Sequence, residues 1–403
     1  MSSILLTLSE PSARPGRVGP APYGLPFLRL GFRPFYLAAA LAAVALMALW
    51  PAVFLGHLRP ASGLAPTLWH AHEMIFGCVV AVVVGFLFTA GKVWTGLATP
   101  RGPALAALTL LWLAGRVAGL AAPGVVFLAV DSAFLGIVAA IFATLVLRSR
   151  NWRNAGVALL LALLAAVNLA FHVAATGGLA DLAMRPLHAA LALLIVLESV
   201  IGGRVIPAFT RSAIPGLALA GRAWLDRVAI GATALGLALW FVGAAPAPSA
   251  AVLAVAALAQ GARLAGWRPW VARQRPILWI LHAAYAWIPL GLALLAAACA
   301  GVLAPSAGVH ALAIGATGGL VIGMLTRTAR GHTGRTLQAS RAEVAAYLLV
   351  LAAAGLRVAA AVEPRWWLEA VCAAGVCWIA AFALYLWRFA PWLVATRLDG
   401  KDG

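Results

Sequence analysis

The sequence has very few acidic residues and few charges of any kind. Asp and Glu contribute 11 of its 403 residues, and charged residues make up 10% of the chain, against roughly a quarter in an ordinary soluble domain. This charge content excludes a typical soluble fold. Hydrophobic residues reach 64% and the mean hydropathy is +0.99, which predicts an integral membrane protein.

Long polar linkers and short alternating strands are also missing. Apolar runs of about 20 residues, enough to span a bilayer as a helix, follow one another with short breaks rich in Arg, Pro and Gly. A barrel would need short alternating strands, so we expect an all-α bundle. The sequence predicts a cytoplasmic segment (1–34), a polytopic domain of about twelve transmembrane helices (35–390) and a cytoplasmic tail (391–403). The expected spans are 35–55, 68–90, 103–120, 123–147, 155–176, 184–208, 226–244, 248–265, 277–300, 303–326, 343–361 and 366–388.

One side of the predicted membrane almost lacks basic residues. Its loops hold Arg59, Arg185 and Arg365, whereas the other loops and both termini hold nearly all the remaining Lys and Arg. The positive-inside rule places that second side, and both termini, in the cytoplasm. The net charge of +18 therefore indicates membrane topology and a lipid bilayer as partner, and no nucleic acid is expected. The N-terminus shows no signal-peptide pattern.

Cysteine is scarce and carries no motif. The four cysteines all lie inside predicted spans without CxxC spacing, so neither a redox pair nor covalent haem attachment is indicated, and buried packing is expected.

Histidine supplies most of the intramembrane polar chemistry. An ionisable group in a membrane helix is costly and usually faces the bundle interior. The predicted topology puts five histidines from four helices in the outer leaflet, while His282 lies in the inner third. Neutral imidazole is the commonest metal ligand and suits copper, iron, zinc and haem. A hydrogen-bonded core histidine is the alternative for each one alone. The candidate metal ligands are His70, His72, His172, His188, His282 and His310.

The stretch LWHAHEMIFG (68–77) carries two of these histidines. At about 100° per residue, His70 and His72 point roughly 200° apart, onto opposite flanks of one helix. They therefore cannot bind one metal unless the helix unwinds. They can meet two cofactors, or one can be a ligand and the other a supporting donor. Glu73 and Met74 are expected near the His70 flank, where either could support a metal.

Two further spacings suggest supporting side chains. Asn168 and His172 are four residues apart and share a helix face, so the amide could orient the imidazole. His282 and Tyr285 are three apart and stack one above the other.

Charged residues at other depths have two interpretations. Glu198 and Arg204 lie on one predicted helix, near and below mid-membrane. They could form part of a proton route from the cytoplasm, or a salt bridge that fixes helix packing. Arg116 and Asp131 fall at similar depth on consecutive helices and are expected to pair.

Seven segments in order along the chain resemble the NnrS family of bacterial membrane proteins linked to nitric oxide metabolism and nitrosative stress. The segments are GFRPFYL (31–37), WHAHEMIFG (69–77), GFLFTAGKVWTG (85–96), GGRVIPAFT (202–210), LHAAYAWIPLG (281–291), HALAIGATGG (310–319) and GHTGR (331–335). The resemblance implies haem and copper as cofactors, intramembrane histidine ligands and a bacterial cytoplasmic (inner) membrane location. The positions that match family motifs are His70, His72, Glu73, His282, His310, His332 and Arg335.

The basic GHTGR loop with His332 and Arg335 could hold anionic groups such as haem propionates or lipid headgroups. An ordinary positive-inside loop is the alternative.

Two functions follow from these residues. The first is a haem- and copper-binding protein acting on nitric oxide or a related small molecule; if it turns over, its electrons would come from a quinol or a protein donor. Whether it is an enzyme stays open. The second is a proton-coupled secondary transporter that uses Glu198, Arg204 and the histidines. Metal analysis and absorption spectra would separate the two.

Overall fold

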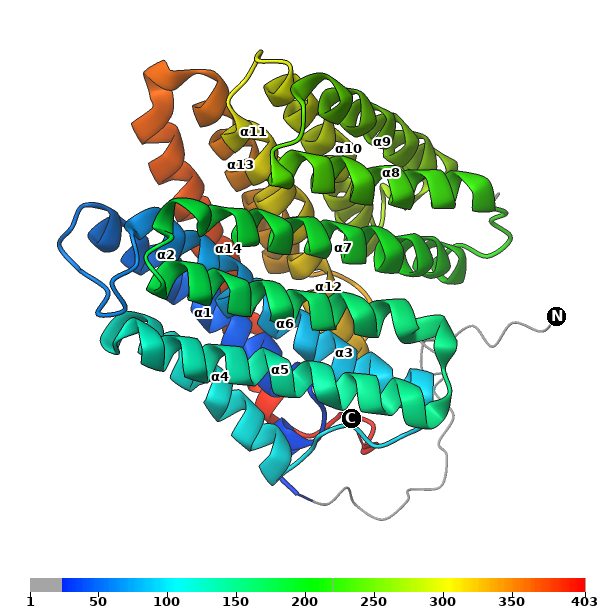
Figure 1. The fold of residues 1–403 in the computed structure, drawn as a ribbon. Helices are drawn as coiled ribbons and strands as arrows, with labels where there is room; N and C mark the ends of the chain where they lie inside the picture. The colour runs from blue at the N-terminus through cyan, green and yellow to red at the C-terminus, as the bar shows by residue number, and fades with distance from the viewer. Residues whose placement is uncertain (1–23, 220, 403) are drawn as a thin grey trace.

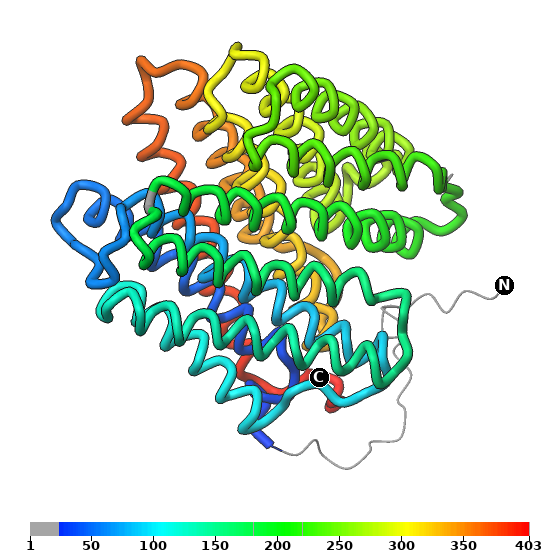
Figure 2. Tube along the Cα trace, in the orientation of Figure 1, coloured from blue at the N-terminus to red at the C-terminus, as the bar shows by residue number. Residues whose placement is uncertain are grey.

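The computed structural model describes residues 24–219 and 221–402 (Figure 1). Most of the predicted cytoplasmic segment 1–34 lies outside this part. Within it, twelve helical spans are long and apolar enough to cross a membrane. They run side by side in one bundle, as the chain trace in Figure 2 also shows. The predicted all-α polytopic architecture is confirmed.

The twelve spans are built from fourteen α-helices and short 3-10 or π-helical pieces. The α-helices, in chain order, are α1 (Phe32–Phe54), α2 (Pro66–His72), α3 (Val80–Thr95), α4 (Pro103–Ala121), α5 (Gly124–Ser149), α6 (Ala155–Thr176), α7 (Met184–Ala213), α8 (Ala223–Val242), α9 (Pro246–Gly266), α10 (Pro276–Cys299), α11 (Pro305–His310), α12 (Gly319–His332), α13 (Arg341–Val362) and α14 (Trp367–Val394).

Two central spans contain a π-helical segment. Segment η2 (Glu73–Val79) joins α2 to α3, and segment η6 (Ala311–Gly318) joins α11 to α12. The two composite spans are the most enclosed of the twelve, with 72% of their apolar windows buried. Such π-helical turns are rare and concentrate at functional sites. Apolar patterning gave no sign of them.

The other spans wrap around these two. Consecutive helices α4 to α6 and α7 to α10 pack against one another in sequence order, α13 pairs with α14, and α14 returns to α1. Several helices run past the predicted apolar ends; α3 continues to Thr95 and α7 to Ala213. Hydropathy marks where apolar side chains stop, whereas the backbone hydrogen bonds of a helix continue to its cap, which for α3 is the left-handed Gly96.

One end of the bundle is cross-linked by a buried ion pair. The Nε and NH2 groups of Arg330 on α12 donate to the Glu343 carboxylate on α13 at 2.6 and 2.5 Å. The same carboxylate accepts from the Ser340 backbone N–H at 2.7 Å, while the Ser340 hydroxyl caps α13. This end therefore has a fixed geometry.

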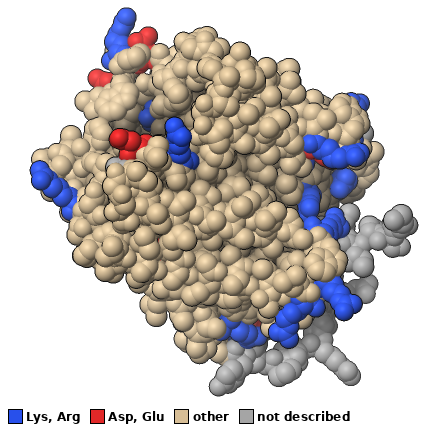
Figure 3. All heavy atoms as spheres, viewed as in Figure 1, with Lys and Arg blue, Asp and Glu red and all other residues tan. Residues whose placement is uncertain are grey.

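Basic side chains are unevenly distributed over the surface. Figure 3 shows most of the visible Lys and Arg atoms along the right and lower right edge, and only a few at the upper left. The asymmetry follows the loop charges in the sequence. That the basic edge faces the cytoplasm stays a prediction.

We expect the Gly319→Ala substitution to lower stability by about 1–3 kcal/mol through overpacking. A Cβ at this position would lie 2.7 Å from the Cβ and 3.3 Å from the Cα of Ala284 on α10, and neither atom can rotate away. The unfolding midpoint in detergent measures the loss. Gly355→Ala is the matched control, because its added Cβ meets nothing within 4 Å. Equal losses in both variants would contradict close contact between α10 and α12.

Candidate functional site

A buried polar cluster forms around His72 at the end of α2. Its Nδ1 atom lies 3.1 Å from Glu73 Oε1, and its Nε2 atom lies 3.1 Å from Asn168 Oδ1 and 3.3 Å from Asp131 Oδ2. Both ring nitrogens thus face oxygen acceptors. A neutral imidazole donates only one hydrogen bond, so satisfying both sides requires the imidazolium form.

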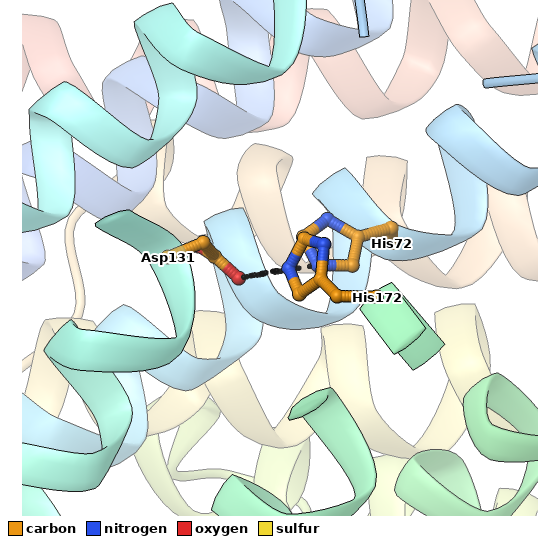
Figure 4. A group of neighbouring side chains, drawn as sticks. All are labelled: His72, Asp131 and His172. Carbon is orange, nitrogen blue, oxygen red and sulfur yellow. Dashed lines mark hydrogen bonds and ion pairs between the residues drawn. The ribbon is translucent and has the colours of Figure 1, made fainter. Parts of the chain in front are cut away.

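Asp131 on α5 joins the two neighbouring helices. Its Oδ2 atom accepts from Asn168 Nδ2 at 2.7 Å and lies 3.0 Å from His172 Nε2. Figure 4 shows its carboxylate pointing toward the two imidazole rings. One ligand atom from each of His72, Asp131 and His172 lies within 4.8 Å of the others. Two imidazoles and a carboxylate form a donor set that suits a divalent transition metal.

Arg116 on α4 connects the two carboxylates of the cluster. Its NH1 group donates to Glu73 Oε1 at 2.8 Å, and its NH2 group donates to Asp131 Oδ1. The predicted pair between Arg116 and Asp131 is therefore present. With neutral histidines the cluster carries one net negative charge, which must be neutralised at this depth. A proton on His72 or on one of the carboxylates, or a bound cation, would do so.

Aromatic rings seal the cluster on several sides. The His72 ring stacks on Phe171 with centroids 4.7 Å apart, and Phe76 and Phe127 lie at 5.0 and 5.1 Å. Low local polarity strengthens electrostatic interactions inside this shell. One buried acceptor, Glu73 Oε2, has no hydrogen-bond partner in the described part of the chain. A further ligand or water would satisfy it, which fits a metal-loaded site.

The opposite flank of the same helix has different neighbours. His70 stacks on Trp50 of α1 with ring centroids 4.3 Å apart, and it interacts electrostatically with His310 and Arg357. His310 Nδ1 donates to the Ser306 carbonyl oxygen at 2.8 Å, so its Nε2 carries the free lone pair. The two histidines of LWHAHEMIFG thus face opposite ways, as helical geometry predicts.

Arg357 gives this second flank a positive charge. Its NH2 group donates to Ser306 Oγ at 3.1 Å, and its NH1 atom is buried without a hydrogen-bond partner in the described residues. The His72 flank contains two carboxylates and one guanidinium, so with neutral histidines its net charge is negative. The flank of His70 and His310 contains the Arg357 guanidinium, so its net charge is positive. The His72 flank therefore favours a cation, and the flank of His70 and His310 favours an anion.

Two supporting residues have other contacts than expected. Glu73 bonds to His72 and Arg116 instead of supporting the His70 flank, because its long side chain reaches toward the guanidinium. Asn168 contacts His72 and Asp131 rather than orienting His172. Met74 packs against the hydrophobic core, and its role in supporting a metal near His70 stays a prediction.

The remaining histidine candidates lie in separate surroundings. His188 packs on Trp240 with centroids 4.5 Å apart. His282 Nε2 lies 3.0 Å from Thr210 Oγ1. Its expected neighbour Tyr285 belongs to another network, in which it receives a hydrogen bond from Arg263 at 2.7 Å. His188 was predicted at the same membrane depth as His72 and His172 but has a different neighbour. Equal predicted depth therefore did not bring these histidines into one site.

The GHTGR loop packs against the C-terminal tail. His332 lies on Phe32 with ring centroids 5.4 Å apart, and its carbonyl oxygen accepts from Arg397 at 3.1 Å. Arg335 sits over the Trp392 ring at 4.1 Å. Hydrogen bonds from Arg397 also lower the pKa of the tail carboxyl Asp399 to about 2. These contacts give the loop a structural role in docking the tail.

Sequence reasoning missed Asp131 as a member of the histidine cluster. The expected ion pair with Arg116 accounted for the buried charge of Asp131, and its closeness to His72 and His172 was not predicted. The available signal was depth, since Asp131, His72 and His172 all fall in the outer part of their predicted spans. An acidic residue at the level of several histidines is a ligand candidate even when an arginine is near.

The fold and the cluster define a class: a polytopic α-helical membrane protein with a candidate metal site of two histidines and an aspartate inside the bundle. Residues 26–397 match the family model described as NnrS protein. The chain belongs to the NnrS family. No significant match was found among curated proteins.

Proposed function

We propose that the protein is a metal-binding component of the bacterial response to nitric oxide, located in the cytoplasmic (inner) membrane. The observation that carries the proposal is the convergence of His72, Asp131 and His172 from three helices, with ligand atoms within 4.8 Å. Family membership supports the link to nitric oxide. The buried, aromatic-lined setting supports a site for a small uncharged molecule that reaches it from the bilayer.

Copper is the ion we propose for this triad. Imidazole nitrogens suit copper, and the net negative charge of the cluster suits any divalent cation. A bound copper ion would supply one-electron chemistry and a coordination position for nitric oxide. The chain's own residues hold the site: Arg116 fixes both carboxylates, and Asn168 fixes Asp131 relative to His72. Such supporting contacts orient ligands before the metal arrives.

Haem is assigned to the opposite flank, between His70 and His310. The free Nε2 of His310 and the neighbouring imidazole of His70 would hold the haem, because imidazole is a ligand of haem iron. The unpartnered NH1 of Arg357 can bind a carboxylate such as a haem propionate. The charge of this flank supports an anionic cofactor, just as the charge of the His72 flank supports a cation.

Metal analysis of purified protein tests the proposal. We expect wild-type protein to contain a tightly bound transition metal and to change its absorption spectrum on addition of nitric oxide. His172→Ala should lose most of the non-haem metal, while His57→Ala, at an exposed loop position, should retain it. Folded wild-type protein without metal or colour would overturn the proposal and favour the transporter interpretation. Iron in place of copper would reassign the ion.

A further inference from the structure

A second polar feature, with none of the residues of the two flanks, lies where α7 meets the π-helical segment η6. Glu198 is on α7, and Thr317 is its neighbour on η6. The Glu198 Oε2 atom and the Thr317 hydroxyl oxygen are both buried without a hydrogen-bond partner in the described part of the chain. Two facing helices therefore each present an unsatisfied oxygen to the same place.

Unsatisfied buried oxygens are uncommon, because a buried oxygen without a partner has lost its hydrogen bonds to water and gained none in return. An unseen water or ion is the usual reason for such a group. An ionised carboxylate at this depth would also need a nearby cation. No ion pair involves Glu198 among the described residues, and Thr317 brings no charge. Thr317 lies close enough to interact with the Glu198 carboxyl group, and a protonated carboxyl group with the Thr317 hydroxyl and a water as partners would satisfy both oxygens.

Most titratable groups on the packed helices have partners of their own, and Arg357 of α13 donates through NH2 to Ser306 while its NH1 group has no partner among the described residues. On α9, Arg263 binds Asp226 of α8 and the Ser199 carbonyl. The others form contacts of their own: Tyr285 with Gln260, His282 with Thr210, His72 with Glu73, His172 with Asp131, His310 with Ser306 and Arg204 with Asn154. In the described part of the chain, neither these groups nor Arg357 forms an ion pair with Glu198.

The backbone at this position is also unusual. Thr317 lies in the last turn of a π-helical segment, and such segments commonly mark functional positions. On α7, Arg204 is six residues, about 9 Å, further along the helix. Its NH1 group meets Asn154 Oδ1 at 3.3 Å. An acid near the middle of a membrane span, with polar groups toward one end, has the arrangement of a proton site.

We propose that Glu198 and Thr317 form a mid-membrane proton-binding site, at which the Glu198 carboxylate takes up a proton delivered by water and returns it to water. The Thr317 hydroxyl and one water complete the hydrogen bonds of the neutral acid. The site shares no residue with the triad of His72, Asp131 and His172, and its proton binding does not require metal at that triad.

Infrared difference spectra between wild type and Glu198→Gln, recorded across a pH series in H2O and D2O, test the site. We expect a protonated carboxylic acid band that is present in wild type and absent in the variant. The band should vanish as the pH rises and shift in D2O. Thr317→Val should move the band, because it removes a hydrogen-bond partner and keeps the side-chain shape.

Glu369→Gln is the control, because Glu369 is exposed and its removal should leave the band in place. Glu198→Asp keeps a carboxyl group if the Gln variant does not fold, and it should shift the band. A band absent from wild type at every pH would overturn the proposal, as would a band that neither titrates nor shifts in D2O. Metal content should equal wild type in all these variants, so failure here is distinct from failure of the metal site.

Discussion

Arg116→Met is expected to cost about 3–5 kcal/mol of folding free energy, because it leaves buried charge without a partner. Arg116 is 6% exposed and is the guanidinium that bonds both Glu73 and Asp131. Methionine matches much of the volume but removes the charge and the hydrogen bonds. A large drop in the denaturation midpoint in detergent micelles would show the effect.

Two further variants test whether the loss of stability in Arg116→Met comes from the buried cluster. Arg185→Met removes a charge at an exposed position and should change stability within about 0.5 kcal/mol. Adding Glu73→Gln and Asp131→Asn to Arg116→Met removes the uncompensated carboxylates, so much of the stability should return. Residues in one network show such non-additivity. Similar losses for Arg116→Met and Arg185→Met would mean that the cluster contributes little to folding.

The helical architecture could be predicted from the sequence because hydropathy reports directly on bilayer spanning. Twelve apolar runs became twelve spans. The directions of two side chains could also be predicted. His70 and His72 lie in one regular α-helix, so a rotation of about 100° per residue points them in opposite directions. The ion pair between Arg116 and Asp131 could be predicted because the two residues fall at similar depth on consecutive helices.

Partners across helices could not be predicted in the same way. Depth places a residue along the membrane normal but leaves the rotation of each helix about its own axis undetermined. His188 shares the depth of His72 but faces Trp240, whereas His172 faces Asp131. Packing of the whole bundle sets these rotations.

The π-helical segments are a second reason why contacts between helices could not be predicted from the sequence. Each π turn takes in an extra residue and rotates the positions that follow it, so faces predicted from a regular helix no longer apply beyond the start of η2 or η6. Neither η2 nor η6 has a Pro within it, and the apolar pattern continues through both. Only tertiary packing reveals them.

The variants His72→Ala and His70→Ala are expected to remove different cofactors, although the two residues are separated by one alanine. His72 belongs to the negatively charged cluster with Asp131 and His172, and His70 lies with His310 and Arg357. Loss of a supporting contact alone typically lowers metal affinity 10–100-fold, so loss of a ligand should exceed roughly that range.

We expect His72→Ala to lose the non-haem metal and keep the Soret band of haem. His70→Ala and His310→Ala should lose or shift the Soret band and keep the non-haem metal. Absorption spectra and elemental analysis on the same preparations measure both. Joint loss of the two cofactors from every folded variant would contradict separate flanks, since a single helix turned toward one shared site would couple them. Separate loss would mean that His72 and His70 serve different cofactor sites on opposite flanks of one helix.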